Sequence, residues 1–279
     1  MSNASDAEWV VRTPARFGFG ALVEHVRETW RSRSILAVLT QRELKGRYSG
    51  SLLGFGWTLL NPLLLLGVYS LVFSIYLRID VPHYPLFVLS GLLPWLWLSQ
   101  SLASGATSLM QGGMLITKVL FPPQVLPAVQ LASNGLHFLL GLPIVYGLSV
   151  WFGDPAGWTL LALPFVIVAQ AVFLLGFVLA LSSTCVLFRD VQFIVGNLVT
   201  FWFFLTPIAY PASLIPEWAR WVLVVNPFAP FATAYQDILY RGDLPSPRTW
   251  ALMGAWAVVS VIAGTLLFER VRPHLVEEL

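Results

Sequence analysis

The chain has 279 residues, of which 57% are apolar and only 11% are charged, and its mean hydropathy is +0.75. Soluble domains carry about 25% charged residues, so this composition excludes an ordinary water-soluble fold and indicates an integral membrane protein. The net charge of +2 points to neither a nucleic acid nor an acidic partner, and the single cysteine, Cys185, excludes an internal disulfide and a cysteine-based metal cluster.

The polar stretch before the first apolar run carries eight basic residues. No short apolar region with a cleavage site precedes it, so we expect no signal peptide. Apolar residues recur at helical spacing at Leu22, Val26 and Trp30, and Ser34 could cap a second helix that runs to Lys45. This pattern predicts a pair of amphipathic helices on an anionic membrane surface. A cytosolic helix packed on a partner protein is the alternative.

Charge-free intervals predict six membrane spans, because a spanning helix needs about 20 largely apolar residues. The predicted spans are 51–77, 85–109, 126–151, 158–187, 191–211 and 249–268. With both termini in the cytoplasm, the inner segments hold twelve of the sixteen Lys and Arg residues, as the positive-inside rule requires. Gly50 and Gly54 form a small-xxx-small pattern at the start of the first span. We therefore expect an all-α integral membrane protein with one transmembrane domain: an N-terminal region at 1–47, a six-span region at 48–270 and a cytoplasmic tail at 271–279.

The inner loop between the second and third predicted spans, residues 111–123, is compact and largely apolar. It carries one charge, Lys118, and closes on Phe121-Pro122-Pro123. A short amphipathic helix of this kind is typical of a rigid knob that docks on another protein.

Aromatic side chains are the main candidates for substrate contacts within the predicted spans. They could form a translocation path, because aromatic faces stack on sugar rings and slide past apolar chains; packing or contact with lipid is the alternative. The candidate path residues are Trp57, Tyr69, Phe73, Trp202, Phe203, Phe204 and Tyr210. Acidic residues fall outside the predicted spans, which argues against ion-coupled transport and against acid–base catalysis within the membrane.

The segment between the fifth and sixth predicted spans is expected at the outer face. One short helix carries Trp218 and Trp221, a second occupies residues 231–239 and stops at Gly242, and each is too short to span. Such helices lie at the interface or dip into the bilayer against other helices. The candidate external gate consists of Pro216, Trp218, Trp221, Asn226 and Pro227. An aromatic belt that anchors a long loop is the alternative.

The sequence offers no recognisable catalytic centre. It contains no phosphate-binding loop of the G-x-x-x-x-G-K-[ST] type, and His25, His83, His137 and His274 lie far apart. We predict no catalytic residue, no metal and no cofactor in this chain. His137 is the only histidine at membrane depth: it is either a functional ionisable group or a neutral histidine hydrogen-bonded to a neighbouring helix.

Several short motifs in a fixed order give the chain a resemblance to a known family over nearly its whole length. They are Arg42-Glu43-Leu44-Lys45-Gly46-Arg47-Tyr48, Leu53-Gly54-Phe55-Gly56-Trp57 and Leu60-Asn61-Pro62 at the first span, Leu115-Ile116-x-Lys118-x-x-Phe121-Pro122 in the inner loop, Phe188-Arg189-Asp190 after the fourth span, Thr206-Pro207-Ile208-x-Tyr210 at the end of the fifth, and Asn226-Pro227. In these motifs the chain resembles the permease subunit of ABC-2 type exporters, in the branch that exports O-antigen, teichoic acid and capsule polysaccharides.

The resemblance implies a homodimer of six-span subunits in the bacterial inner membrane, with a channel at the subunit interface. Two copies of a separate cytoplasmic ATPase would bind ATP and Mg²⁺, so this chain itself would not be an enzyme. The residues that would couple it to the ATPase are Leu115, Ile116, Lys118, Phe121, Pro122, Arg189 and Asp190.

The expected substrate is a polyprenyl-diphosphate-linked glycan. Its diphosphate would meet the basic residues Arg42, Lys45 and Arg47 near the inner headgroups; anchoring under the positive-inside rule explains the same residues. Two other functions stay open at this point: a membrane enzyme or scaffold that acts on lipid-linked sugars, and an ABC-2 exporter of another lipid or of a drug.

Overall fold

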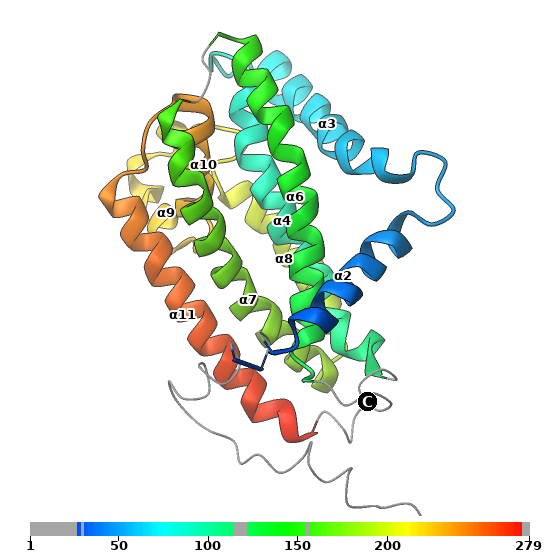
Figure 1. Ribbon diagram of the computed structural model, residues 1–279. Helices are drawn as coiled ribbons and strands as arrows, with labels where there is room; N and C mark the ends of the chain where they lie inside the picture. The colour runs from blue at the N-terminus through cyan, green and yellow to red at the C-terminus, as the bar shows by residue number, and fades with distance from the viewer. Residues whose placement is uncertain (1–26, 29–30, 114–121, 154–156, 275–279) are drawn as a thin grey trace, which may run out of the picture.

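The computed structural model describes residues 27–28, 31–113, 122–153 and 157–274, and within these ranges the chain forms helices and no strand. The prediction of an all-α membrane protein is confirmed. The helical segments that are long and apolar enough to cross a membrane are Gly54–Tyr76, Tyr84–Gln111, Val125–Trp151, Trp158–Leu187 and Pro247–Val271. Figure 1 shows that most of them form an upright bundle, from which the first leans away.

The fifth predicted span ends earlier than residue 211. Helix α8 (Val191–Leu205) has 15 residues. At 1.5 Å per residue its length is about 22 Å, which is less than the roughly 30 Å of a hydrocarbon core. The helix stops because a proline disfavours the helical conformation of the residue before it, and Thr206, before Pro207, is extended with ψ 132°.

The chain after α8 is irregular, but three side chains from other segments donate hydrogen bonds to carbonyl oxygens at and after the end of α8. The Asn226 amide donates to the carbonyl oxygen of Leu205 (3.1 Å), and the Gln236 amide donates to that of Pro207 (2.9 Å). The Tyr84 hydroxyl donates to the carbonyl oxygen of Ala209 (2.7 Å). Non-helical backbone at membrane depth requires such partners, because lipid offers none.

Helix α4 (Tyr84–Gln111) is the centre of the bundle. In an 18-residue apolar stretch of this helix, 78% is buried inside the protein. The helix packs against α6 (Val125–Trp151), α7 (Leu163–Leu187) and α8. The Trp95 ring meets the rings of Trp202, Phe203 and Phe228 edge-on, with centroids 5.4–5.8 Å apart. Because lipid tails are as apolar as the side chains, such close packing has to hold the helices together.

Helix α11 (Pro247–Val271) touches α7 backbone to backbone. A Cβ atom on Gly264 would lie 1.9 Å from the carbonyl oxygen of Gly176, and one on Gly176 would lie 2.2 Å from that of Ser260. The Ser260 hydroxyl donates to the carbonyl oxygen of Phe173 (2.6 Å). Small residues four positions apart therefore let these two helices approach more closely than larger residues would allow.

The predicted pair of short helices is present between α8 and α11. Helix α9 (Trp221–Val225) ends at the Asn226-Pro227 break; α10 (Ala229–Gln236) and the π-helical turn η7 (Asp237–Arg241) follow. Gly242 ends the run with φ +71°, a conformation that glycine adopts without strain. Helix α10 dips into the protein, where it packs against α4, α7 and α11 with its aromatic residues fully buried.

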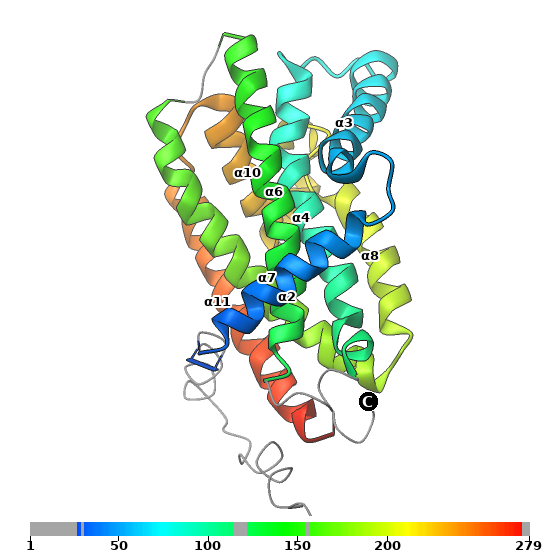
Figure 2. The same ribbon diagram turned by 45° about the vertical axis from the view of Figure 1, so that its right-hand side comes forward.

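Helix α2 (Arg33–Tyr48) runs obliquely across α6, as Figure 2 shows. The predicted cap at Ser34 is wrong, because the helix already begins at Arg33. The amphipathic helix expected around Leu22–Trp30 falls almost wholly outside the described residues. Gly50 and Gly54 have φ +80° and +48° in the connection to α3 (Trp57–Tyr69), so they form no helix-packing face.

The described start and end of the chain meet at one end of the bundle. The Glu28 carboxylate accepts a hydrogen bond from the Gln124 amide (2.6 Å) and lies 3.7 Å from the Arg272 guanidinium. We call this the basal end. At the opposite, distal end, His83 lies against Phe152 with ring centroids 4.5 Å apart.

Candidate functional site

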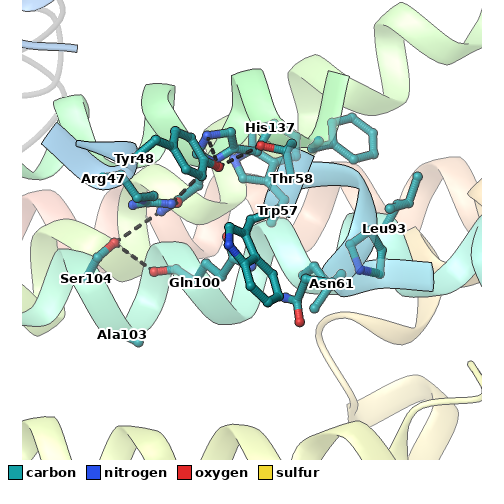
Figure 3. Close-up of a pocket in the computed structure, with 15 residues that line it drawn as sticks. Arg47, Tyr48, Trp57, Thr58, Asn61, Leu93, Gln100, Ala103, Ser104 and His137 are labelled. Carbon is teal, nitrogen blue, oxygen red and sulfur yellow. Dashed lines mark hydrogen bonds between the residues drawn. The ribbon is translucent and has the colours of Figure 1, made fainter. Parts of the chain in front are cut away.

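A groove opens between the end of α2, the start of α3 and the middle of α4 and α6 (Figure 3). Its volume is about 450 Å³. Polar and aromatic side chains from all four helices line it, and we call it the Arg47 groove. The lining residues are Arg47, Tyr48, Trp57, Thr58, Asn61, Pro62, Leu93, Leu96, Trp97, Gln100, Ala103, Ser104, Asn134, His137 and Phe138.

The groove lies well inside helices that are long enough to cross a membrane. Helix α6 begins at Val125, so His137 is about 18 Å along its axis at 1.5 Å per residue. Helix α4 ends at Gln111, and Gln100 is about 16 Å from that end by the same rise. Ionisable groups at such depth are rare and usually functional, so the arginine here needs an explanation.

Arg47 reaches from α2 to α6. Its guanidinium donates to Asn134 Oδ1 (2.9 Å), and the Asn134 amide donates in turn to the hydroxyl of Ser104 (3.1 Å). Among the described residues, the only carboxylate within 4.0 Å of the Arg47 guanidinium is that of Glu43, at 3.8 Å. The cation is thus held mainly by neutral groups, and 28% of its side chain remains exposed.

His137 completes a directed chain of hydrogen bonds. Its Nδ1 lies 3.2 Å from the Arg47 guanidinium, which can only donate, so Nδ1 acts as an acceptor. Its Nε2 then carries the proton and faces the Tyr48 hydroxyl (3.0 Å), which lies 2.6 Å from the hydroxyl of Thr58. A second proton would place two cations side by side. The geometry agrees with a neutral histidine bonded to a neighbouring helix.

Other polar groups in the groove have no hydrogen-bond partner within the part of the chain that the structure describes. They are the side-chain amides of Asn61 and Gln100 and the indole N–H of Trp57. The Trp57 side chain is 44% exposed. A cation, free amides and an open aromatic face can together bind an anionic group joined to a hydroxyl-rich ring.

A second cavity of about 550 Å³ lies on the basal side of Arg47, and we call it the basal cavity. It is lined by Leu39, Arg42, Glu43, Gly46, Arg47, Ser108, Gln111, Gly112, Leu126, Val129 and Gln130. Among the described residues that line the two cavities, Arg47 alone is common to both. Its side chain therefore stands at the boundary between them.

The three basic residues predicted to meet a headgroup occupy different places. Arg42 lines the basal cavity, and Arg47 lines both cavities. Lys45 is exposed on the same helix and lines neither. The structure brings Arg42 and Arg47 together in the lining of the basal cavity and leaves Lys45 outside both cavities.

Most of the predicted coupling segment lies outside the described residues: Leu115, Ile116, Lys118 and Phe121. Pro122 begins the next described stretch, and its carbonyl accepts from the Val125 N–H (3.0 Å). Arg189 and Asp190 are exposed in the turn between α7 and α8. The thiol of Cys185 lies 3.6 Å from the sulfur of Met110, so this turn lies near the end of α4, where the coupling segment begins.

The predicted path residues divide into groups. Tyr69 stacks on Phe203 (4.9 Å between centroids), and Phe73 lies beside Tyr69 (6.3 Å). Phe203 is buried, whereas Phe204 is 54% exposed. The remaining members are Trp57 in the Arg47 groove, Trp202 beside Asn226, and Tyr210, whose hydroxyl donates to the carbonyl oxygen of Phe204 (2.6 Å). A role of these residues in a path stays a prediction.

The predicted gate contains a structural clamp. Asn226 Oδ1 accepts from the indole N–H of Trp202 (2.7 Å) and from the Phe228 N–H (3.0 Å). Its amide donates to the carbonyl oxygen of Leu205 and to the Thr206 hydroxyl (2.9 Å). Asn226 therefore ties the end of α8 to the start of α10. Elsewhere in the set, Pro216 is exposed, Pro227 is half-buried, and the side chains of Trp218 and Trp221 are 80% and 62% exposed.

Sequence reasoning missed three residues that build the Arg47 groove: Gln100, Ser104 and Asn134. A signal was present, because Gln100 and Ser104 are four residues apart and Asn134 precedes His137 by three. Polar residues at helical spacing in an otherwise apolar span mark a polar stripe on one face.

The fold of apolar helices around this groove defines a multi-span membrane protein, and comparison with known families gives its class. A model of the ABC-2 type transporter family matches residues 35–240, and the chain belongs to that family.

The curated relatives are more specific. The chain is 41% identical over 260 residues to the O-antigen export system permease protein RfbA of Myxococcus xanthus. This match covers 92% of this chain and 100% of the relative. The chain is 30% identical over 244 residues to the protein of the same name from Klebsiella pneumoniae, with 87% and 94% covered. The similarity therefore extends over nearly the full length of both relatives.

Proposed function

We propose that this chain is the transmembrane subunit of an ATP-driven exporter that moves a polyprenyl-diphosphate-linked polysaccharide of the O-antigen class across the bacterial inner membrane. The observation that carries this proposal is the full-length similarity to O-antigen export permeases. Membership of the ABC-2 family disfavours the alternative of a membrane enzyme or scaffold that acts on lipid-linked sugars.

The proposed assembly is a homodimer with two ATPase subunits. ATP and Mg²⁺ binding belongs to the partner chain, because this sequence contains no phosphate-binding loop of its own. In an 18-residue apolar stretch of the first span, Gly54–Tyr76, only 11% is buried within the subunit. The exposed apolar side chains of α3 and α8, among them Val68, Leu198 and Phe201, offer a face for a second copy. The basal end would meet the ATPase through the coupling segment, Arg189 and Asp190.

A genetic test with a biochemical control can decide the function. Deletion of the gene should remove O-antigen from the cell surface and accumulate lipid-linked polymer inside, and expression of the chain with its ATPase should restore export. Variants of the ATPase that cannot hydrolyse ATP should fail to restore it. Unchanged surface polysaccharide after the deletion would overturn the assignment. Loss of export of a drug or another lipid would instead identify a different ABC-2 exporter.

A further inference from the structure

We propose that the Arg47 groove binds the glycosyl-diphosphate headgroup of the lipid-linked substrate. In this proposal Arg47 binds the phosphates, while Trp57, Asn61 and Gln100 contact the first sugar. The proposal rests on the proposed function and deepens it, because it places the headgroup in one subunit at membrane depth.

The charge of Arg47 provides the first argument. A cation among apolar helices is stable only when nearby groups compensate for its lost hydration, and a carboxylate or phosphate does so best. Here Asn134 and His137 are neutral partners at 2.9 and 3.2 Å, and Glu43 lies at 3.8 Å. The guanidinium thus keeps positive charge toward the groove. Arginine binds phosphate through two parallel N–H groups, so a diphosphate suits the geometry.

Polar side chains of the groove that have no hydrogen-bond partner among the described residues provide the second argument. The amides of Asn61 and Gln100 lie on α3 and α4 with no hydrogen-bond partner among the described residues, and amides can both donate to and accept from sugar hydroxyl groups. Figure 3 shows Trp57 and Gln100 beside the same opening as Arg47 and Ser104. The volume of about 450 Å³ is within the range of small-ligand sites.

The position of Arg47 between two cavities provides the third argument. The basal cavity extends to Gln111 and Gly112 at the end of α4, and the Arg47 groove begins on the other side of the guanidinium. An anionic headgroup that enters from the basal side would therefore meet Arg42 first and Arg47 next. Arg47 thus lies where the two cavities share a lining residue, within reach of a headgroup in either one.

The test uses the full permease–ATPase complex in nanodiscs, with farnesyl diphosphate bearing one hexose as the probe. The readouts are the dissociation constant of the probe and the rise in melting temperature that it causes. Arg47→Gln should weaken binding at least tenfold, and Arg47→Lys should weaken it less. The control Lys45→Gln removes the same charge from the same helix outside both cavities and should change the dissociation constant less than twofold.

Gln100→Leu keeps the test decisive even if Arg47→Gln fails to fold. The Gln100 side chain makes no hydrogen bond with any described residue, so its replacement leaves the chain of bonds around Arg47 intact. We expect at least a fivefold loss of affinity without a lower melting temperature of the free complex. Probe binding equal to the parent in Gln100→Leu, or in a folded Arg47→Gln, would overturn the proposal.

A soluble nucleoside diphosphate hexose distinguishes the source of the ligand. The proposal expects it to compete poorly, because it lacks the lipid; competition at equal concentration would overturn the assignment to a lipid-linked headgroup. Failure of the proposed function has a different signature: the gene deletion would leave surface O-antigen unchanged, whatever the probe measurements give.

Discussion

At the scale of single residues, Asn226 holds the distal return of the chain in place. Its side chain makes hydrogen bonds to the Trp202 indole, the Phe228 N–H, the Leu205 carbonyl and the Thr206 hydroxyl, and it is 6% exposed. A buried polar group that loses its partner costs about 1–3 kcal/mol. One side chain therefore stabilises the junction of two helices.

Asn226→Ala should lower the free energy of unfolding by at least about 2 kcal/mol, because several buried donors and acceptors lose their partner at once. Thermal unfolding in detergent, followed by far-UV circular dichroism, measures the change. Asn197→Ala is the matched control, since Asn197 is exposed on α8. Equal melting of the two variants would show that water or other side chains replace the clamp.

Trp218 and Trp221 are the two tryptophans of the candidate external gate. Both side chains are more than half exposed in the single subunit, so a constriction has to form against a second copy or the polymer. The double variant Trp218→Ala/Trp221→Ala should raise ion leakage from vesicles and leave binding of the ATPase unchanged, because apolar constrictions exclude water and ions. Trp151→Ala, at another exposed distal tryptophan, is the control. A double variant as tight as the parent, with normal export, would make the segment an aromatic anchor.

At the scale of elements, the contact of α7 with α11 leaves no space for a side chain at Gly264. Gly264→Ala should destabilise the protein by about 1–3 kcal/mol or more, as overpacking does, because the new Cβ would overlap the Gly176 carbonyl. Gly254→Ala on the same helix meets nothing within 4 Å and should be neutral or stabilising. Denaturation in mixed micelles compares the two. A stable Gly264→Ala variant would mean that the helices separate without loss.

Local chemistry made several elements predictable. The Asn226-Pro227 break, the stop at Gly242 and the apolar runs of the long helices follow from residues close in sequence. The early end of α8 was also encoded, in Pro207, but the charge-free interval that continues beyond Leu205 obscured it. The Arg47 groove could not be derived in this way, because Arg47 and Asn134 are 87 residues apart and meet only through the packing of α2 on α6.

For the whole molecule, the orientation of the basal and distal ends in the membrane is a testable prediction. We expect the basal end in the cytoplasm, according to the positive-inside rule. In a Cys185→Ala background, Arg189→Cys should react with an impermeant maleimide only after the membrane is opened. Trp218→Cys should react in intact spheroplasts. The reverse pattern would invert the topology.

Docking of the ATPase on the inner loop is a further testable prediction. Phe121→Ala should uncouple ATP hydrolysis from export while the protein still folds, because a buried aromatic side chain supplies much of the affinity of a docking surface. The ratio of ATP hydrolysed to polymer exported, at matched protein levels, is the measurement. Normal export by this variant would remove Phe121 from the contact.

The irregular segment after α8 has a consequence for amide hydrogen exchange. Its carbonyls at Leu205, Pro207 and Ala209 are bound by side chains from Asn226, from the last residue of α10 and from the first residue of α4. The N–H groups of Thr206 and Ile208 donate to the carbonyl oxygens of Phe203 (3.1 Å) and Thr206 (2.8 Å). Because local opening of this stretch would also break the three side-chain bonds, these two amides should exchange as slowly as those of the adjacent helix. Any opening at the distal end would then have to move α4, α10 and the end of α8 together.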